Sequence, residues 1–426
     1  MQSSMKRLAV RVVGVVLVVL LAALLVTRWI GASRLRAAQR AFDAKLGDAG
    51  GYASSAVPEN ENASIFLRAA AEAVYLPGND RPRAEGLTTT ALDAWTEGDR
   101  AFLGDVLARN APALELARRA SAFARSSYGL TYHTYIIEEL NEKVPMLKLL
   151  RLQRLLWLDS VMALRGGERE RLRADAAAMG TLAASLERES PVIALMVGVA
   201  AEKVLEGTVN LWVEWGDGEA AAASALQRAL PQTDLRGAWR RCLAVTGRVG
   251  REAVVEPDRV RPEEVQLTLR NNALTRFVFG ALSDSRILAD LASISDAVDT
   301  PYGSRSDPAG GMTSAVASWQ PLRAGAARVQ TAIAQRNLAR VALALRARGV
   351  EAGAYPDSLA GIPGALAPDP FAGKPLTYER RPDGSAVLAI PDGEALWKKL
   401  SNGITASCPY TWVLPAPGKA AEATRK

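Results

Sequence analysis

The chain has 426 residues, enough to bury a substantial core in two or three domains, and its 49% apolar and 23% charged residues are ordinary for a globular protein. Its net charge of +7 is carried by residues 1–45, which hold eight bases and one acid, whereas the remaining chain holds 44 bases and 44 acids. A body that binds nucleic acid would need a basic face of its own, so no nucleic-acid partner is expected.

An apolar segment near the N-terminus predicts a membrane anchor. Residues 12–27 carry no charge, and extension from Leu8 to Ile30 gives the roughly 20 residues that cross the hydrocarbon of a bilayer. Arg11 can extend its charge to the head groups, and Trp29 suits the interface between lipid and water. We therefore expect residues 8–30 to hold the chain in a lipid bilayer, with residues 1–30 forming a short tail and the anchor.

A cleaved signal peptide is the main alternative for this segment. The small residues Gly31-Ala32-Ser33 resemble a cleavage site loosely, but Arg28 and Trp29 interrupt the apolar stretch before them, so an uncleaved anchor is favoured. The positive-inside rule, applied to the flanking charges, favours a cytoplasmic body, whereas a very short N-terminal tail favours an exported one. We expect a bacterial inner-membrane protein with a single span and a periplasmic or otherwise extracytoplasmic body.

The rest of the chain is predicted to be mainly α-helical. Residues 31–57 are polar and end in a glycine- and serine-rich stretch, which predicts a juxtamembrane linker. An all-helical body is expected over 58–350, where apolar residues recur at helical spacing between proline and glycine breaks. The strongest pattern begins at Pro145 and ends at Gly166-Gly167, and because it is apolar nearly all round it predicts a central helix.

Two parts of this body resemble each other. Trp157 followed by Gly166-Gly167-Glu168 is echoed by Trp212 followed by Gly216-Asp217-Gly218-Glu219. A long helix, a glycine turn and a shorter helix make one antiparallel hairpin, and such hairpins stack in TPR-like repeat proteins. A helical repeat is one interpretation, and an accidental similarity between two helical hairpins is the other.

The C-terminal part changes character. Prolines forbid a long helix in residues 351–412, and two strand-like pieces at 376–380 and 386–390 flank an Asp-Gly turn that suits a β-hairpin. Residues 413–426 are expected to be disordered. Cys242 and Cys408 are too far apart for a CxxC motif; an exported body would allow them to form a disulfide, but two buried thiols are favoured.

Several segments together resemble a class of uncharacterised bacterial single-pass membrane proteins with helical extracytoplasmic bodies. Their order along the chain carries the resemblance, which covers most of the sequence and implies export and helical architecture but no activity. The segments are Pro58-Glu59-Asn60-Glu61-Asn62-Ala63, Asn110 to Leu116, Leu149 to Gly167, Glu189 to Ala201, and Tyr355-Pro356 through Tyr378.

The tail separately resembles the end of type II secretion pseudopilins, in which a long helix leads into a Tyr-Pro turn, an Asp-Pro-aromatic-Gly loop and a small hairpin. The matching residues are Tyr355-Pro356, Asp369-Pro370-Phe371-Ala372-Gly373 and Tyr378. Two parts of that pattern are missing. The acidic glycine-rich loop that binds calcium is reduced to Pro391-Asp392-Gly393-Glu394, and the N-terminal processing signature is absent.

One histidine offers the most specific candidate for chemistry. His133 lies in Tyr132-His133-Thr134-Tyr135, just before the acidic residues Glu138 and Glu142. One interpretation makes His133 a general base oriented by a carboxylate, with these tyrosines and glutamates as surface candidates. The favoured interpretation is an aromatic packing corner beside a solvated acidic face. A single histidine also excludes HExxH zinc sites.

No other motif predicts catalysis. The sequence lacks GxSxG, GxxxxGK[ST] and a GxGxxG after a strand, and nothing selects a pair among its many carboxylates. We therefore expect no cofactor, no metal and no catalytic residue.

The function expected from these patterns is an envelope scaffold whose helical hairpins bind a protein or peptide. An envelope hydrolase that acts on wall polymer or peptide through carboxylates is the alternative, and an accessory component of a secretion system is a third, based on the tail alone. A concave helical surface without clustered acids favours the scaffold. A deep cleft with two convergent carboxylates, or His133 bonded to a carboxylate, favours the hydrolase.

Overall fold

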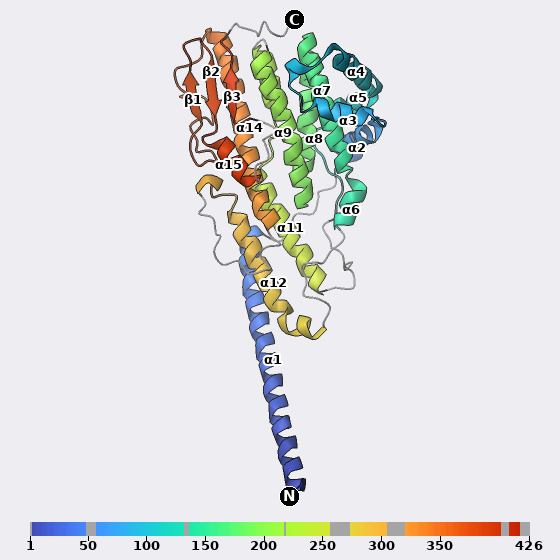
Figure 1. Ribbon diagram of the computed structural model, residues 1–426, viewed down its shortest axis with the longest axis vertical. Helices are drawn as coiled ribbons and strands as arrows, with labels where there is room; N and C mark the ends of the chain where they lie inside the picture. Colours follow the sequence, from blue (N-terminus) through green and yellow to red (C-terminus); the bar gives the residue numbers. More distant parts are fainter. Residues whose placement is uncertain are drawn as a thin grey trace.

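The computed structural model describes residues 2–47, 57–131, 136–216, 219–255, 273–304, 320–401 and 409–417. It confirms the predicted fold class, because the protein is mainly helical with one N-terminal apolar helix and a small antiparallel sheet near the C-terminus. Figure 1 shows the first helix projecting from one end of an elongated body, with the sheet at the other end beside the body helices.

Helix α1 runs without a break from Gln2 to Leu46, about 68 Å at 1.5 Å per residue. Its side chains from Val18 to Ile30 are mostly exposed, and only 6% of its most apolar stretch is buried. By length and composition α1 can therefore cross a membrane, as expected of the anchor. The linker predicted to begin at residue 31 is wrong as far as Leu46: no glycine or proline interrupts residues 32–46, and Phe42 and Leu46 are buried in the body.

The body consists of helices of 8 to 33 residues that pack mostly lengthwise. They are α2 (Ala63–Ala73), α3 (Asp80–Leu87), α4 (Glu97–Arg109), α5 (Ala111–Ala120), α6 (Ile136–Lys143), α7 (Met146–Gly166), α8 (Arg169–Glu187), α9 (Val192–Trp215), α10 (Ala220–Ala229), α11 (Leu235–Val255), α12 (Ala273–Asp296) and α14 (Gln320–Ala352). Short 3-10 turns lie at Glu59–Glu61, Leu92–Ala94 and Tyr302–Ser304.

Helix α7 is central, as its sequence predicts. It begins after Pro145 and ends at Gly167, whose φ of 71° is a backbone conformation that glycine adopts without strain. Both α8 and α9 pack against it, and ten of its residues are buried. The main core of the body therefore forms around α7, α8 and α9.

A second, smaller core joins helix α1 to the body. Phe42 and Leu46 of α1 pack with buried side chains of α9, α11, α12 and α14, among them Leu195, Trp239 and Leu291. Ala38 and Leu35 lie one and two turns before Phe42 on the same face and pack against this core. The end of α1 is thus a structural part of the body.

The two predicted helical hairpins differ in the structure. Helices α7 and α8 pack against each other as a hairpin, whereas α10 packs mainly against α8 and α14 rather than back along α9. Gly180 explains the difference, because a Cβ atom there would lie 1.8 Å from the carbonyl oxygen of Ala229, so only glycine permits this approach of α8 and α10. The proposed repeat stays a prediction.

The C-terminal part forms a small module on α14 and α9. The predicted β-hairpin is confirmed as β1 (Thr377–Arg380) and β2 (Ala386–Ala389), and helix α15 (Gly393–Leu400) follows. A third strand, β3 (Thr411–Leu414), pairs with β2, so the predicted disorder is wrong at its beginning. Trp412 and Leu414 are buried while their neighbours are exposed, a period of two that fits a strand. Residues 418–426 lie outside the described residues.

Two buried polar side chains join this module to the helices. The Tyr355 hydroxyl donates to the carbonyl oxygen of Pro415 at 2.8 Å and accepts from Arg346 Nη1 at 3.1 Å. Arg346 also donates to the carbonyl of Gly216 at 3.0 Å, at the end of α9. Of the cysteines, Cys242 is buried with a free thiol, and Cys408 lies outside the described residues.

Candidate functional site

A cleft of about 410 Å³ opens between α8, the segment that follows α5, and the end of α10. Its floor is a stripe of small residues on one face of α8, Ala177, Gly180, Thr181 and Ala184, which recur at the spacing of a helical face. One wall is the segment 121–126, and the other runs from Ala225 to Gln232. No bulky side chain rises from this floor, and at Gly180 the backbone of Ala229 packs directly against it.

Three arginines line the cleft. Arg173 lies on α8 four residues before the floor, Arg188 directly follows the end of α8 four residues after the floor, and Arg228 lies on the α10 wall. At 1.5 Å per residue, Arg173 and Arg188 are about 22 Å apart. None of the lining residues is acidic; the polar ones include Ser121, Ser126 and Thr181. The cleft is thus a positively charged groove with hydroxyl groups along it.

The arginines differ in how far they are neutralised. Arg173 forms ion pairs with Glu170 at 2.8 Å and Glu219 at 3.0 Å. Arg188 donates to the carbonyl oxygen of Ala124 at 3.1 Å, and neither it nor Arg228 forms an ion pair with a carboxylate in the described part of the chain. Two arginines therefore keep their charge available to an incoming anion.

Two buried polar atoms at the cleft also lack a partner. Among the described residues, neither Arg173 Nε nor the Ser126 hydroxyl has a hydrogen-bond acceptor or donor within reach. Such atoms cost free energy when they are left unpaired, so a bound ligand or water that bonded to them would be stabilised.

The first wall of the cleft is fixed by a cluster of two arginines and two aspartates. Arg118 on α5 donates to Asp175 on α8 at 2.7 Å and also pairs with Asp159 on α7. Asp159 in turn accepts from Arg171, and both aspartates are fully buried. This cluster holds the end of α5, and hence the segment 121–126, against the floor helix.

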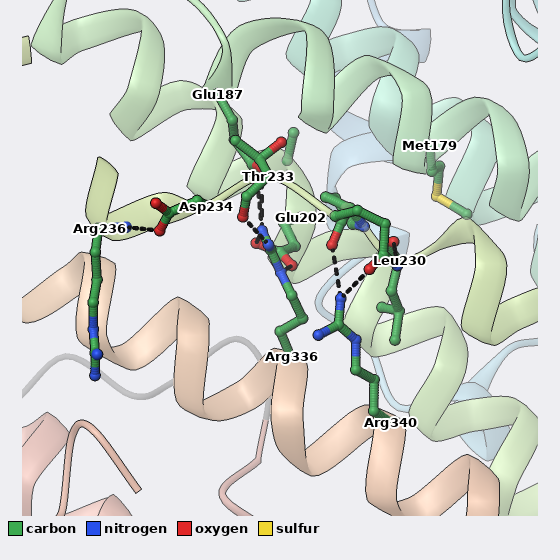
Figure 2. A network of polar contacts seen from close by, with 12 residues as sticks. Met179, Glu187, Glu202, Leu230, Thr233, Asp234, Arg236, Arg336 and Arg340 are labelled. Carbon is green, nitrogen blue, oxygen red and sulfur yellow. Dashed lines mark hydrogen bonds and ion pairs between the residues drawn. The ribbon is translucent and has the colours of Figure 1, made fainter. Parts of the chain in front are cut away.

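The second wall is fixed by arginines of α14 (Figure 2). Arg336 pairs with Glu187 of α8 at 3.1 Å and with Glu202 of α9, and its Nη1 donates to the carbonyl of Thr233 at 2.8 Å. One turn later, Arg340 donates to the carbonyl of Pro231 at 3.0 Å. The wall segment 230–233 is thereby tied to α8, α9 and α14 together.

Burial shifts the titration of these carboxyl groups. Burial and the neighbouring Asp159 raise the pKa of Asp175, and burial together with Glu202 raises that of Glu187. Glu206, on the next turn of α9, is fully buried and has no hydrogen bond to either carboxyl oxygen within the described structure; burial and Glu202 raise its pKa well above its usual value.

These acidic groups are clustered but closed to solvent. Asp159, Asp175, Glu187, Glu202 and Glu206 each have 0% relative exposure, and none of them lines the cleft. No group of three or more metal-ligating side chains occurs in the ranges that the structure describes. The clusters therefore position helices and have no access to a substrate.

A second, more open hollow of about 660 Å³ lies on the C-terminal module. It is lined by Asp392 and Glu394, but Asp392 pairs with Lys374 at 3.0 Å, and Glu394 lies 3.5 Å from the backbone N–H of Tyr410. Both carboxylates are exposed and already have partners within the protein.

The structure places the predicted site residues only in part. Tyr132, His133 and Tyr135 lie outside the described residues, and so does the side chain of Glu138, although its backbone belongs to α6. Glu142 is exposed on α6. The contact that forms here involves Glu139, which accepts from the backbone N–H of Thr131 at 2.9 Å and pairs with Lys143 at 2.6 Å. The proposed pairing of His133 with a carboxylate stays a prediction.

Sequence reasoning missed the cleft arginines. Its signal was present in α8, where Arg173 and Arg188 bracket the small residues of the floor at helical spacing. From the sequence alone, that stripe of small residues could equally be a face of α8 buried in the core. Arg228 comes from a different helix, so its place beside α8 could not be predicted.

Comparisons with known proteins give no further guide. No protein-family model matches the chain, and neither the curated proteins nor the solved structures contain a significant match. The family resemblances expected from the sequence stay predictions.

Proposed function

We propose that the protein is a membrane-anchored binding protein that holds an extended acidic peptide segment of a protein partner in the α8 cleft. The observation that carries the proposal is the groove itself, in which Arg173 and Arg188 bracket a floor of small residues and no acid is present. An extended peptide rises about 3.3 Å per residue, so six or seven residues would match the distance between these two arginines.

The composition of the cleft supports a peptide as the ligand. Phe123, Leu230 and Pro231 give it apolar surface beside the arginines, and the hydroxyls of Ser121, Ser126 and Thr181 can bond to a peptide backbone. Both walls are held to the floor by the buried arginine–carboxylate clusters. A groove of fixed width needs little reorganisation on binding, which favours affinity.

The hydrolase alternative has less support. The carboxylates that come together in the described part of the chain are buried against Arg118, Arg171 and Arg336, and the cleft lining contains none. A non-enzymatic scaffold therefore accounts for more of the observed side chains.

The proposal includes the setting. Helix α1 would cross the bacterial inner membrane, with the body on the outer side. Because the end of α1 is buried in the body, the cleft would stand at a fixed distance from the lipid surface. Protease added outside spheroplasts is expected to digest such a body.

Binding of a defined peptide tests the proposal. Full-length protein in lipid nanodiscs is titrated with a fluorescein-labelled octapeptide of alternating leucine and glutamate, and with the same peptide carrying glutamine. We expect the acidic peptide to bind, the glutamine peptide to bind at least tenfold more weakly, and affinity to fall as salt rises, because Arg188 and Arg228 contribute charge-assisted hydrogen bonds of about 1.5–3 kcal/mol each.

Matched variants make this experiment specific. Arg188→Gln combined with Arg228→Gln should weaken the acidic peptide at least tenfold. Arg348→Gln combined with Arg381→Gln removes the same charge from two exposed sites outside the cleft, one near the end of α14 and one after β1, and should leave affinity unchanged. Equal weakening by both pairs, or equal binding of both peptides, would contradict the proposed site.

A further inference from the structure

The start of helix α12 lies beside the anchor rather than beside the body. Figure 1 shows that it reaches further toward the N-terminal end of α1 than any other labelled helix of the body. The two helices pack along each other over much of α12. The start of α12, in this position beside α1, must be surrounded by water, by protein or by lipid.

Two contacts fix how α12 is aligned with α1. A Cβ atom added to Gly31 would lie 3.4 Å from Ala281 Cβ, and about four turns later Lys45 pairs with Asp296. In both contacts the two residues are nearly the same number of positions apart in the sequence. The two helices therefore run in the same direction. The common rise of 1.5 Å per residue places Phe279 level with Trp29 and Ala273 no deeper than Ala23.

The same alignment relates α12 to the membrane boundary. Trp29 is 67% exposed, and with Arg28 it marks the end of the apolar stretch of α1. The first turns of α12 thus lie at the level where that stretch passes from acyl chains to head groups.

The sequence of these turns suits that level. Residues 273–283, ALTRFVFGALS, contain one charge, Arg276, and include Phe277, Val278 and Phe279 in succession. Helices that lie in the membrane interface bury phenylalanine and leucine at the boundary of the acyl chains and direct basic side chains to the head groups. Charges begin to recur at Asp284, on the part of α12 nearer the body.

We propose that the first two turns of α12 form a second membrane contact, immersed in the interface of an anionic bilayer beside α1. The inference rests on the proposed crossing of the membrane by α1. Two contacts at one level would restrict the tilt and rotation of the body, and so would fix the direction in which the cleft faces.

Depth-dependent quenching tests the contact. In full-length protein with Cys242 and Cys408 replaced by alanine, single cysteines are introduced as Phe277→Cys, Val19→Cys and Ala289→Cys and labelled with the fluorophore NBD. Val19 is 60% exposed in the apolar stretch of α1, and Ala289 is exposed on α12 about 18 Å nearer the body than Phe277. The protein is placed in liposomes of phosphatidylcholine and phosphatidylglycerol that carry a nitroxide near the top of the acyl chain.

The expected result is strong nitroxide quenching and weak iodide quenching at positions 277 and 19, and the reverse at 289. Two outcomes at position 277 would contradict the contact while position 19 is still quenched by lipid. In the first, position 277 behaves like position 289; in the second, protein protects it from both quenchers. In either case α1 lies in the membrane but α12 does not contact the bilayer. If position 19 is not quenched by lipid, the anchor itself is wrong. Phe279→Cys, labelled in parallel, must agree with Phe277→Cys, and thermal melts identify any variant that fails to fold.

Discussion

Glu206 is the residue whose burial has the clearest consequence for pH. Because the pKa of Glu206 is raised in the folded state, the folded chain keeps its proton at pH values above 4.5, the ordinary pKa of a glutamate, where the unfolded chain loses it. Its contribution to stability is therefore fully present below about pH 4.5 and is lost progressively above it. The environment favours a neutral carboxyl group, since neither oxygen accepts a hydrogen bond within the described structure.

Glu206→Gln should isolate this effect. Glutamine does not ionise in the folded or the unfolded chain, so its stability does not depend on pH in this way. Relative to the parent chain, the variant is therefore expected to gain stability as the pH rises from 5 to 8, by at most about 1.4 kcal/mol per pH unit. Denaturant unfolding of the detergent-solubilised protein at several pH values measures the difference. Glu115→Gln, at an exposed site on α5, should change little across this range. A constant difference for Glu206→Gln at every pH would contradict a buried neutral carboxyl group.

Two asparagines show what can be predicted at single residues. Asn62 caps α2 by accepting from Ser64 N, and the same side chain bonds to Ser127 across the fold. Asn110 precedes α5 but makes no side-chain cap; it bonds to both backbone groups of Tyr75 and to the carbonyl of Val106. Asparagine at either position is compatible with a helix start, but the partners that decide the role of each amide lie far away in the sequence and could not be predicted from it.

At the scale of helices, Gly180 controls how closely α10 approaches the floor helix. Gly180→Ala would drive a Cβ atom into the backbone oxygen of Ala229, so α10 must move away. We expect a loss of about 1–3 kcal/mol in unfolding free energy, typical of overpacked contacts, and weaker binding of the acidic peptide because Ala229 lies in the cleft wall.

Gly104→Ala is the matched control for this substitution. Gly104 also lies inside a helix, α4, but a Cβ atom there meets nothing within 4 Å. Alanine should stabilise this site by about 0.5–1 kcal/mol through its better helix propensity. Chemical denaturation compares the two variants, and the account is wrong about α10 if both substitutions stabilise the protein.

Helices were predicted better than their packing. The apolar run after Pro145 and the glycines at its end predicted α7 and its central position, and the Asp-Gly turn predicted the β1–β2 hairpin. The sequence missed β3 because the prolines after Leu414 suggested disorder, and it placed a linker where α1 continues. In both cases the deciding factor is tertiary: Leu414 packs in the module, and Phe42 packs against α9, α11, α12 and α14.

On the scale of the whole molecule, an exposed apolar helix and a compact polar body require different surroundings. Val18, Leu21 and Val26 are each more than half exposed, which in water would be a large unpartnered apolar surface. The remaining described helices contribute apolar side chains to two hydrophobic cores. The membrane-anchored binding protein that we propose depends on this contrast.

The most direct test is proteolysis and extraction of the full-length chain with an N-terminal epitope tag in a Gram-negative host. Spheroplasts are treated with protease from outside, and their membranes are then washed with alkaline carbonate. We predict that a short tagged fragment remains in the membrane pellet and that the body has been digested. Recovery of the intact chain in the carbonate-soluble fraction would mean that α1 does not lie in lipid and would contradict the account.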